Sequence, residues 1–157
     1  TDVDVNEVVL NAVSDAQVSS RDHTWRLNLP DAPLMVRADE FQLHQVFTNL
    51  LSNARKHTPA GTIVTTTVRL DGRDAVITVE DNGPGVPPDK QALIFKPFWQ
   101  SAGSETSGKK SSQGSAGLGL AMVHKAIARH GGTIRVFNHP TGGACFEICL
   151  PQGMQDV

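Results

Sequence analysis

Asn49, Asn53, Lys56 and His57 lie at positions i, i+4, i+7 and i+8 of a stretch with helical periodicity. Residues at this spacing share one face of an α-helix, so the four side chains form a polar stripe. Asparagine is a poor residue for a helix interior, because its amide competes with the backbone for hydrogen bonds. Two such amides one turn apart favour a site for a hard cation and phosphate, since amide oxygens suit Mg²⁺. A solvated helix face is the alternative that this stripe alone leaves open.

Asp81 ends a second segment, in which Ala75, Ile77 and Val79 alternate with other residues. Strict alternation along a strand puts the carboxylate on the same face as these apolar side chains. A carboxylate in such a place is costly unless hydrogen-bond donors reach it. It can cap the following turn through the backbone, or it can accept a hydrogen bond from a ligand with an N–H edge, such as adenine. The two glycines at 83 and 85 favour the ligand, because a bare backbone approaches a flat ring closely.

Residues 114–120 form a third segment, in which three glycines open a predicted helix. Glycines there allow a polyanion to approach free backbone N–H groups and the positive end of the helix dipole. One glycine-rich turn is weak evidence by itself, because most such segments are only turns. This one follows a long serine-rich loop over 101–115, which we expect to close over phosphates as a lid.

The remaining pattern predicts the elements that position these residues. In the first part of the chain we expect a helix over 5–18, extended pieces over 24–29 and 34–36, and a helix over 39–57 with Asp39 as its N-cap. Strands over 62–70 and 74–81 then form a hairpin around an Asp71-Gly72 turn. Short helical turns over 87–99, a helix over 117–130, and a hairpin of strands over 133–138 and 144–150 complete the order. This order favours an α+β fold in one domain spanning 1–157. The architecture expected is a two-layer α/β sandwich, with a mixed, mostly antiparallel sheet covered by helices on one face.

Composition narrows the classes of function. A chain of 157 residues with 39% hydrophobic residues can build one globular core. A net charge of −2 provides no bulk electrostatic footprint for nucleic acid or an anionic membrane. Cys145 and Cys149 are the only cysteines, which excludes a disulfide framework and a four-cysteine zinc site; we expect both to be small core residues on one strand face. No apolar run approaches the ~18 residues of a membrane span, so we expect a cytoplasmic location.

In this order and spacing, these segments resemble the boxes of the ATP-binding catalytic domain of sensor histidine kinases. That domain belongs to a wider superfamily with gyrase B, Hsp90 and MutL. Residues 49–57 look like the N box, 81–86 the first glycine box, 94–99 the F box, and 117–121 the second glycine box. The resemblance covers essentially the whole chain and implies a Bergerat-type ATP-binding fold. The closing hairpin, residues 137–146, together with residues 82–88, is similar to the corresponding segments of Kdp-type potassium or turgor sensing kinases.

The resemblance also implies roles for individual residues. Asn53 is expected to ligate Mg²⁺, with Asn49 and Lys56 on the phosphates, and these residues form the expected catalytic set. His57 stands beside the nucleotide, where the family usually has Tyr, and Asp81 is expected to accept the adenine amino group. The other nucleotide-binding residues implied by the resemblance are Gly83, Gly85, Val86, Phe95, Phe98, Gly117, Leu118, Gly119 and Leu120, with Phe95 and Phe98 anchoring the lid. Gln100 departs from the family, which usually has a phosphate-binding Arg there.

The function implied is transfer of the ATP γ-phosphoryl group to a histidine on a dimerisation domain absent from this chain. None of His23, His44, His124, His130 and His139 lies in a segment like the family's acceptor helix, and we interpret them as surface or structural residues. The implied partners are ATP, that dimerisation domain and a downstream response regulator, with no nucleic acid. The isolated chain is expected to be a monomer, and the parent kinase a homodimer that can be anchored in a membrane.

Two alternatives come from the same superfamily. ATP hydrolases of the gyrase or MutL type carry a Glu one helical turn before the metal-binding Asn, where it activates water. This chain has Asn49 at that position, which favours a kinase over a hydrolase. A non-catalytic nucleotide-binding module is the second alternative, because Gln100 cannot neutralise phosphate charge.

Overall fold

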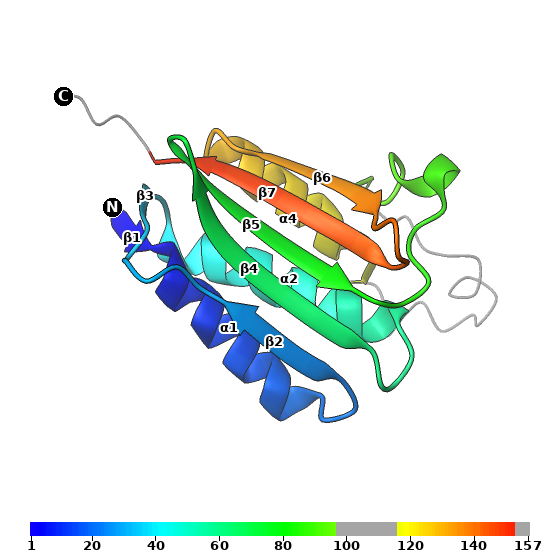
Figure 1. Ribbon diagram of the computed structural model, residues 1–157. Coiled ribbons are helices and arrows are strands. Elements are labelled where there is room, and N and C mark those ends of the chain that lie inside the picture. Colours follow the sequence, from blue (N-terminus) through cyan, green and yellow to red (C-terminus); the bar gives the residue numbers. More distant parts are fainter. Residues whose placement is uncertain (97–115, 153–157) are drawn as a thin grey trace.

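A five-stranded sheet forms one layer of the structure, and helices cover one of its faces (Figure 1). The computed structural model describes residues 1–96 and 116–152. The strands lie in the order β2 (Thr24–Asn28), β4 (Ile63–Asp71), β5 (Asp74–Asp81), β7 (Ala144–Pro151) and β6 (Thr133–Asn138). The pair β2–β4 is parallel and the other pairs are antiparallel. The predicted mixed, mostly antiparallel sheet is confirmed.

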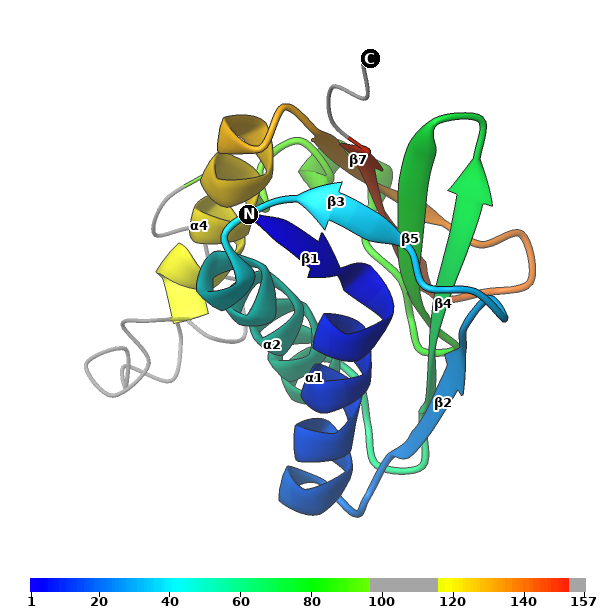
Figure 2. The same cartoon turned by 90° about the vertical axis from the view of Figure 1, so that its left-hand side faces the viewer.

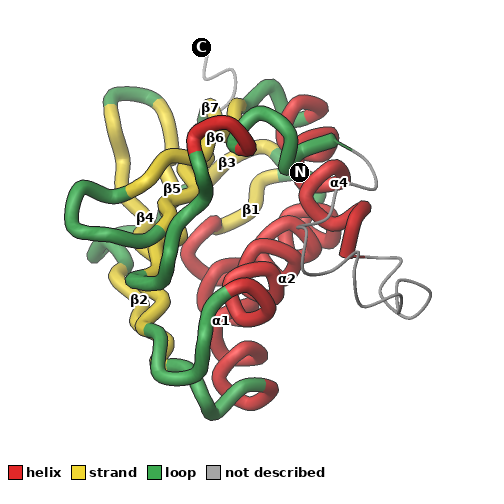
Figure 3. Tube along the Cα trace, turned by 90° about the vertical axis from the view of Figure 1, so that its right-hand side faces the viewer, coloured by secondary structure: helices red, strands yellow, loops and turns green. Residues whose placement is uncertain are grey.

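The helix layer consists of α1 (Val5–Ser19), α2 (Glu40–His57) and α4 (Ala116–Arg129). Helix α2 packs against both α1 and α4, and all of them lie on one side of the sheet (Figure 2). Figure 3 shows the same two layers from the opposite side. Among the described residues, no helix combines the length and the apolar character that a membrane span requires.

The sequence of α2 explains why it forms and how it is oriented. Asp39 is the N-cap, as predicted, because its carboxylate accepts a hydrogen bond of 3.1 Å from the Gln42 N–H. At the other end the Thr58 hydroxyl donates to the Ala54 carbonyl over 2.6 Å. The buried face consists of Leu43, Val46, Phe47, Leu50, Leu51 and Ala54. Truncating Phe47, which is 1% exposed, to Ala costs about 3–5 kcal/mol in such a core.

The β4–β5 hairpin places Asp81 at the end of an apolar face. Gly72 has a φ of 63° in the connecting turn, a conformation that glycine adopts without steric cost. The register pairs Val64 with Asp81, and Val64 is fully buried under the helices. Asp81 therefore shares the inner face of β5 with Ile77 and Val79, as alternation predicted.

The N-terminal region departs from the prediction of one sheet. Strand β1 (Asp2–Asp4) pairs antiparallel with β3 (Met35–Arg37) in a separate two-stranded sheet. Asp4 then caps α1, since its carboxylate accepts hydrogen bonds from the N–H groups of Asn6 (3.0 Å) and Leu34 (3.2 Å). These strands have three residues each, too short for alternation to indicate a partner.

The cysteines share one face of β7, as predicted, but that face is the outer face of the sheet. Cys145 pairs with Glu80 and Cys149 with Val76, both of which point away from the helices. Cys145 is buried and Cys149 is half-buried. Burial raises the pKa of the Cys145 thiol to about 12, so it is a poor nucleophile at neutral pH.

The segment between β5 and α4 is described only in part. Short helical turns were expected over 87–99, and the structure has a 3₁₀ turn, η1 (Pro88–Lys90), followed by further turns to residue 96. Residues 97–99 and the predicted lid, 101–115, lie outside the described residues.

Candidate functional site

One face of α2 and the start of α4 enclose a pocket of about 150 Å³. Its lining residues are Asn49, Ser52, Asn53, Lys56, His57, Gly119 and Leu120. A Cβ atom on Gly119 would stand 4.0 Å from Cγ of Asn49, so the two helices meet closely here. The polar stripe and the second glycine-rich segment, far apart in the sequence, thus form one site.

The pocket lining suits an anion with an accompanying cation. Asn49 and Asn53 are half-buried and supply amide oxygens, while Lys56 is exposed and supplies a positive charge. No carboxylate belongs to the described lining. An anionic ligand therefore meets a positive charge and neutral dipoles, without a repelling group of its own sign.

His57 also lines this pocket, and its imidazole is uncharged at neutral pH. Its side chain keeps an exposed surface, yet the surrounding protein displaces part of its solvent. This partial desolvation lowers the pKa of His57 below the ordinary value of 6.5, and the charge of Lys56 lowers it further. The imidazole is therefore uncharged at neutral pH and can donate or accept a hydrogen bond.

The start of α4 contributes backbone as well as side chains. Gly117 and Leu118 lie in the first turn of the helix, followed by half-buried Gly119 and buried Leu120. The first N–H groups of a helix have no partner within the helix, and an anion is one acceptor that can satisfy them.

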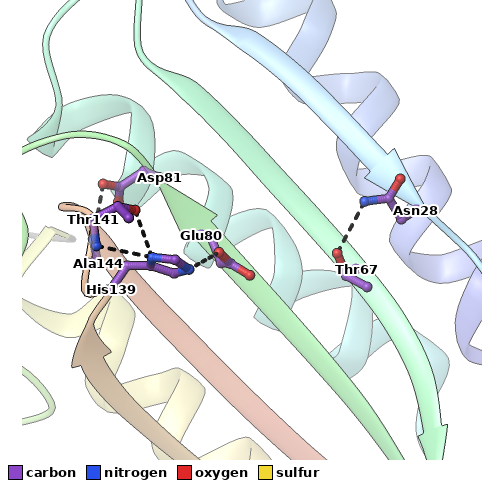
Figure 4. A network of polar contacts seen from close by, with 7 residues as sticks. All are labelled: Asn28, Thr67, Glu80, Asp81, His139, Thr141 and Ala144. Atoms are coloured by element: carbon purple, nitrogen blue, oxygen red, sulfur yellow. Dashed lines mark hydrogen bonds and ion pairs between the residues drawn. The ribbon is translucent and has the colours of Figure 1, made fainter.

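The Asp81 carboxylate is held from two sides. Its Oδ1 accepts hydrogen bonds from the N–H groups of Gly83 (2.9 Å) and Ala144 (3.2 Å), and Figure 4 shows the latter. The bond from Gly83 is the turn cap that the sequence left open as an alternative. Among the described residues Oδ2 has no hydrogen-bond partner, so capping and acceptance from a ligand are compatible.

Glycines bring other segments directly against Asp81. A Cβ on Gly143, whose φ is 98°, would stand 1.8 Å from the backbone oxygen of Asp81. A Cβ on Gly83 would stand 2.9 Å from Cγ2 of Thr58, the residue that follows the polar stripe of α2. The end of β5 is therefore in contact with both the β6–β7 turn and the end of α2.

Asn138 contacts the first glycine-rich segment in a way that the sequence did not indicate. Its Oδ1 accepts a hydrogen bond from the Val86 N–H, and its Nδ2 donates to the Val86 carbonyl, each over 2.8 Å. Gln91 Nε2 donates to the same carbonyl over 3.1 Å. The only sequence signal was an amide residue at a strand end, which is common before turns.

His23 is a structural residue, as interpreted, and it supports the end of α2. It is 9% exposed, and its Nε2 lies 2.8 Å from the Thr58 hydroxyl. Because that hydroxyl already donates to Ala54, it must accept here, so His23 carries its proton on Nε2. Thr58, missed by sequence reasoning, thus joins α2 to the chain before β2 and to Gly83.

The F-box segment is anchored at its first aromatic residue. Phe95 is half-buried and makes an edge-to-face contact with Phe146, with ring centroids 6.2 Å apart. It also contacts the His124 ring at 5.6 Å, and the preceding Ile94 is 5% exposed. Phe98 and Gln100 lie outside the described residues.

Comparison with known proteins places this arrangement in a family. Residues 38–154 match the family model described as "Histidine kinase-, DNA gyrase B-, and HSP90-like ATPase". The chain is 45% identical over 149 residues to the probable sensor histidine kinase TcrY of Mycobacterium tuberculosis, covering 95% of this chain and 30% of TcrY. It is 37% identical over 126 residues to the Escherichia coli sensor protein KdpD, covering 80% of this chain and 13% of KdpD.

A solved structure agrees over nearly the whole chain. The mycobacterial sensor histidine kinase MprB superposes with a TM-score of 0.81 at 28% identity, covering 96% of this chain and 97% of that structure. The Kdp-type resemblance of the closing hairpin is consistent with KdpD being a relative, although the identity to TcrY is higher. The chain spans less than a third of the length of the two curated relatives named above. It belongs to the family of histidine kinase-, DNA gyrase B- and HSP90-like ATPases, as an ATP-binding catalytic domain of the sensor histidine kinase type.

Proposed function

We propose that this chain binds Mg-ATP and transfers the γ-phosphoryl group to a histidine on a dimerisation domain of a longer kinase. The observation that carries the proposal is the pocket between α2 and α4, in which Asn49 and Asn53 lie beside Gly119 and no described carboxylate is present. The same proposal places the domain in the cytoplasm and gives the parent kinase a response regulator as its downstream partner.

Asn53 is proposed as the protein ligand of Mg²⁺. Among the described residues no group of three or more His, Cys, Asp or Glu side chains could hold a metal ion by itself. A lone amide oxygen fits Mg²⁺ only if phosphates and water complete its octahedral shell, which is how this ion is usually held by nucleotide-binding proteins. When bound, the ion would neutralise negative charge on the phosphates.

The other residues of the pocket hold and orient the phosphates in this proposal. Lys56 supplies positive charge and Asn49 an amide, while the backbone N–H groups at the start of α4 add donors. Asp81 accepts the adenine amino group through Oδ2, the oxygen that its own turn leaves available among the described residues. Adenine and phosphates are then fixed at opposite ends of one nucleotide.

The reaction needs positioning more than acid–base chemistry. A neutral imidazole nitrogen of the acceptor attacks the γ-phosphorus, an N–P bond forms, and the bond from phosphorus to the β–γ bridging oxygen breaks. ADP leaves with that electron pair. The transition state of phosphoryl transfer is loose, so alignment and charge neutralisation provide most of the catalysis.

Hydrolysis is the second candidate, and Asn49 argues against it. Water is a poor nucleophile without a base, and an amide one turn before Asn53 cannot take a proton. Asn49 also lines the pocket itself, so the residue facing the phosphates at this point is neutral. A non-catalytic nucleotide-binding module is the third candidate, favoured by Gln100 in place of the usual Arg.

Incubation with radiolabelled ATP separates these candidates. We expect the chain alone neither to label itself nor to turn ATP over, and an added phosphoacceptor domain to acquire acid-labile phosphohistidine. Multiple-turnover hydrolysis by the chain alone would favour the hydrolase. Tight nucleotide binding without transfer to any supplied acceptor domain, including that of TcrY, would favour the non-catalytic module.

A further inference from the structure

We infer that Asn138 is a positioning residue for the adenine end of the nucleotide site. Its side-chain amide fixes the segment Gly85–Val86, which follows the proposed adenine acceptor Asp81. The inference rests on the proposed function, since it assumes that a nucleotide binds here, and it adds a residue from a part of the chain that carries none of the four boxes.

The contact has the geometry of a strand pairing. In an antiparallel sheet, a residue exchanges N–H and C=O bonds with the residue opposite, and the Asn138 amide does the same with Val86. The two residues are 52 positions apart in the sequence. An alanine at 138 could form neither bond, and an aspartate would place a second acceptor against the Val86 carbonyl.

Only glycine at position 85 leaves room for the Asn138 amide. Its φ is 82°, and a Cβ atom there would lie 2.7 Å from Oδ1 of Asn138. Glycine is thus required at this position twice, for the backbone conformation and for the close approach of the amide. The second requirement exists only because Asn138 is present.

The same hairpin also holds Asp81. The Ala144 N–H donates to the carboxylate, and Gly143 lies against the Asp81 backbone oxygen. Figure 1 shows the β6–β7 turn beside the end of β5, and Figure 4 shows the bond from Ala144. The segment 138–144 therefore fixes both the acceptor and the loop behind it, so their spacing is set before a ligand arrives.

This arrangement lowers the entropy that nucleotide binding must remove. A loop that is already ordered loses little freedom when it contacts the base, whereas a loop released at Val86 would have to be ordered by the ligand. The loss of two hydrogen bonds between neutral groups predicts ADP binding about tenfold weaker in Asn138→Ala.

The test is calorimetric titration of the chain with ADP. Asn28→Ala is the matched control, because Asn28 is also an exposed asparagine bonded to one residue, Thr67 Oγ1 at 3.4 Å (Figure 4). This bond joins the edge strand β2 to β4, at the opposite edge of the sheet from Asn138 in β6. We expect Asn28→Ala to bind ADP like the wild type. We expect both Asn138→Ala and Asn138→Asp to bind ADP more weakly than the wild type, because neither side chain can donate to the Val86 carbonyl.

A double-mutant cycle separates positioning from general destabilisation. In an Asp81→Asn background, the loss caused by Asn138→Ala should shrink to less than about twofold, because the contact that it positions is already gone. An equal loss in both backgrounds, or wild-type affinity in Asn138→Ala and Asn138→Asp, would overturn the inference alone. A wild-type chain that binds no ADP would overturn the proposed function, and this inference with it.

Discussion

At the proposed phosphate end of the nucleotide site, Asn49, Asn53 and Lys56 project from a single helix, whereas the proposed adenine end around Asp81 joins several segments through backbone contacts. The described residues offer no hydrogen-bond partner to the side chains at the phosphate end. Asp81, in contrast, accepts from two N–H groups of two different segments. Substitutions at the phosphate end should therefore change chemistry and leave the fold intact, while those at the adenine end should affect both.

Asn53→Ala should produce the largest effect on activity. Removing the proposed metal ligand should slow transfer to a supplied phosphoacceptor domain by more than about a thousandfold, or roughly 4 kcal/mol of barrier. The thermal unfolding midpoint should not change, because Asn53 lies outside the buried face of α2. Near-normal transfer would show that Asn53 is not the metal ligand. A large drop in the unfolding midpoint would contradict the expectation that substitutions at the proposed phosphate end leave the fold intact.

Gly143→Ala should produce the largest effect on stability, and Gly142→Ala is its matched control. Both residues have positive φ, 98° and 109°, so either alanine costs about 1–2 kcal/mol. Only at Gly143 would the new Cβ meet the Asp81 backbone, which we expect to add more than about 3 kcal/mol. Urea denaturation measures the difference. Equal stabilities of the two variants would show that the β6–β7 turn is not fixed against β5.

Asp81→Asn should weaken ADP binding by about a hundredfold, or roughly 2.7 kcal/mol. The loss combines an acceptor bond from a charged group with a new donor that faces the adenine amino group. The amide oxygen can still accept from the N–H groups of Gly83 and Ala144, so the chain should remain folded. Calorimetry that finds equal ADP affinity for the two chains would refute the adenine assignment.

Lys56→Ala should weaken binding of ATP about three- to tenfold, with Arg55→Ala as its control. The two cations are neighbours on an exposed part of α2, but only Lys56 lines the pocket with Asn53. The effect is modest because an exposed charge is screened, and it should shrink further in about 1 M salt. Equal losses of ATP affinity in the two variants would indicate a general effect of net charge, and would contradict a specific contact of Lys56 with the phosphates.

His57 should give the smallest effect, a pH dependence of stability. Since its folded-state pKa lies below 6.5, the unfolded chain binds this proton first as the pH falls, and stability decreases through that window. His57→Gln should remove this dependence, which we expect to be well under about 1 kcal/mol at an exposed site. Urea denaturation at pH 7.5 and pH 5.5 compares the two chains. A wild type that becomes relatively more stable at pH 5.5 would contradict the lowered pKa.

The sequence predicted most of the elements because their patterns are local. Asp39 as the N-cap and the helical spacing of the polar residues from Asn49 to His57 indicated α2, and the structure confirms the cap and the helix. The Asp71-Gly72 turn indicated the β4–β5 hairpin, and alternation then placed Asp81 on the inner face. The second sheet and the outward position of the cysteines were missed, because strand partners and sheet faces depend on distant segments.

For this protein, then, the sequence alone determined the residue types at the proposed phosphate end, their common helix face and the family that they indicate. Only the tertiary structure decided that Gly119 lies against Asn49, that Thr58 contacts Gly83, and that Asn138 pairs with Val86. A helix face follows from a 3.6-residue period within one segment. The adenine end follows instead from hydrogen bonds and close backbone approaches between segments far apart in the sequence, which no local period encodes.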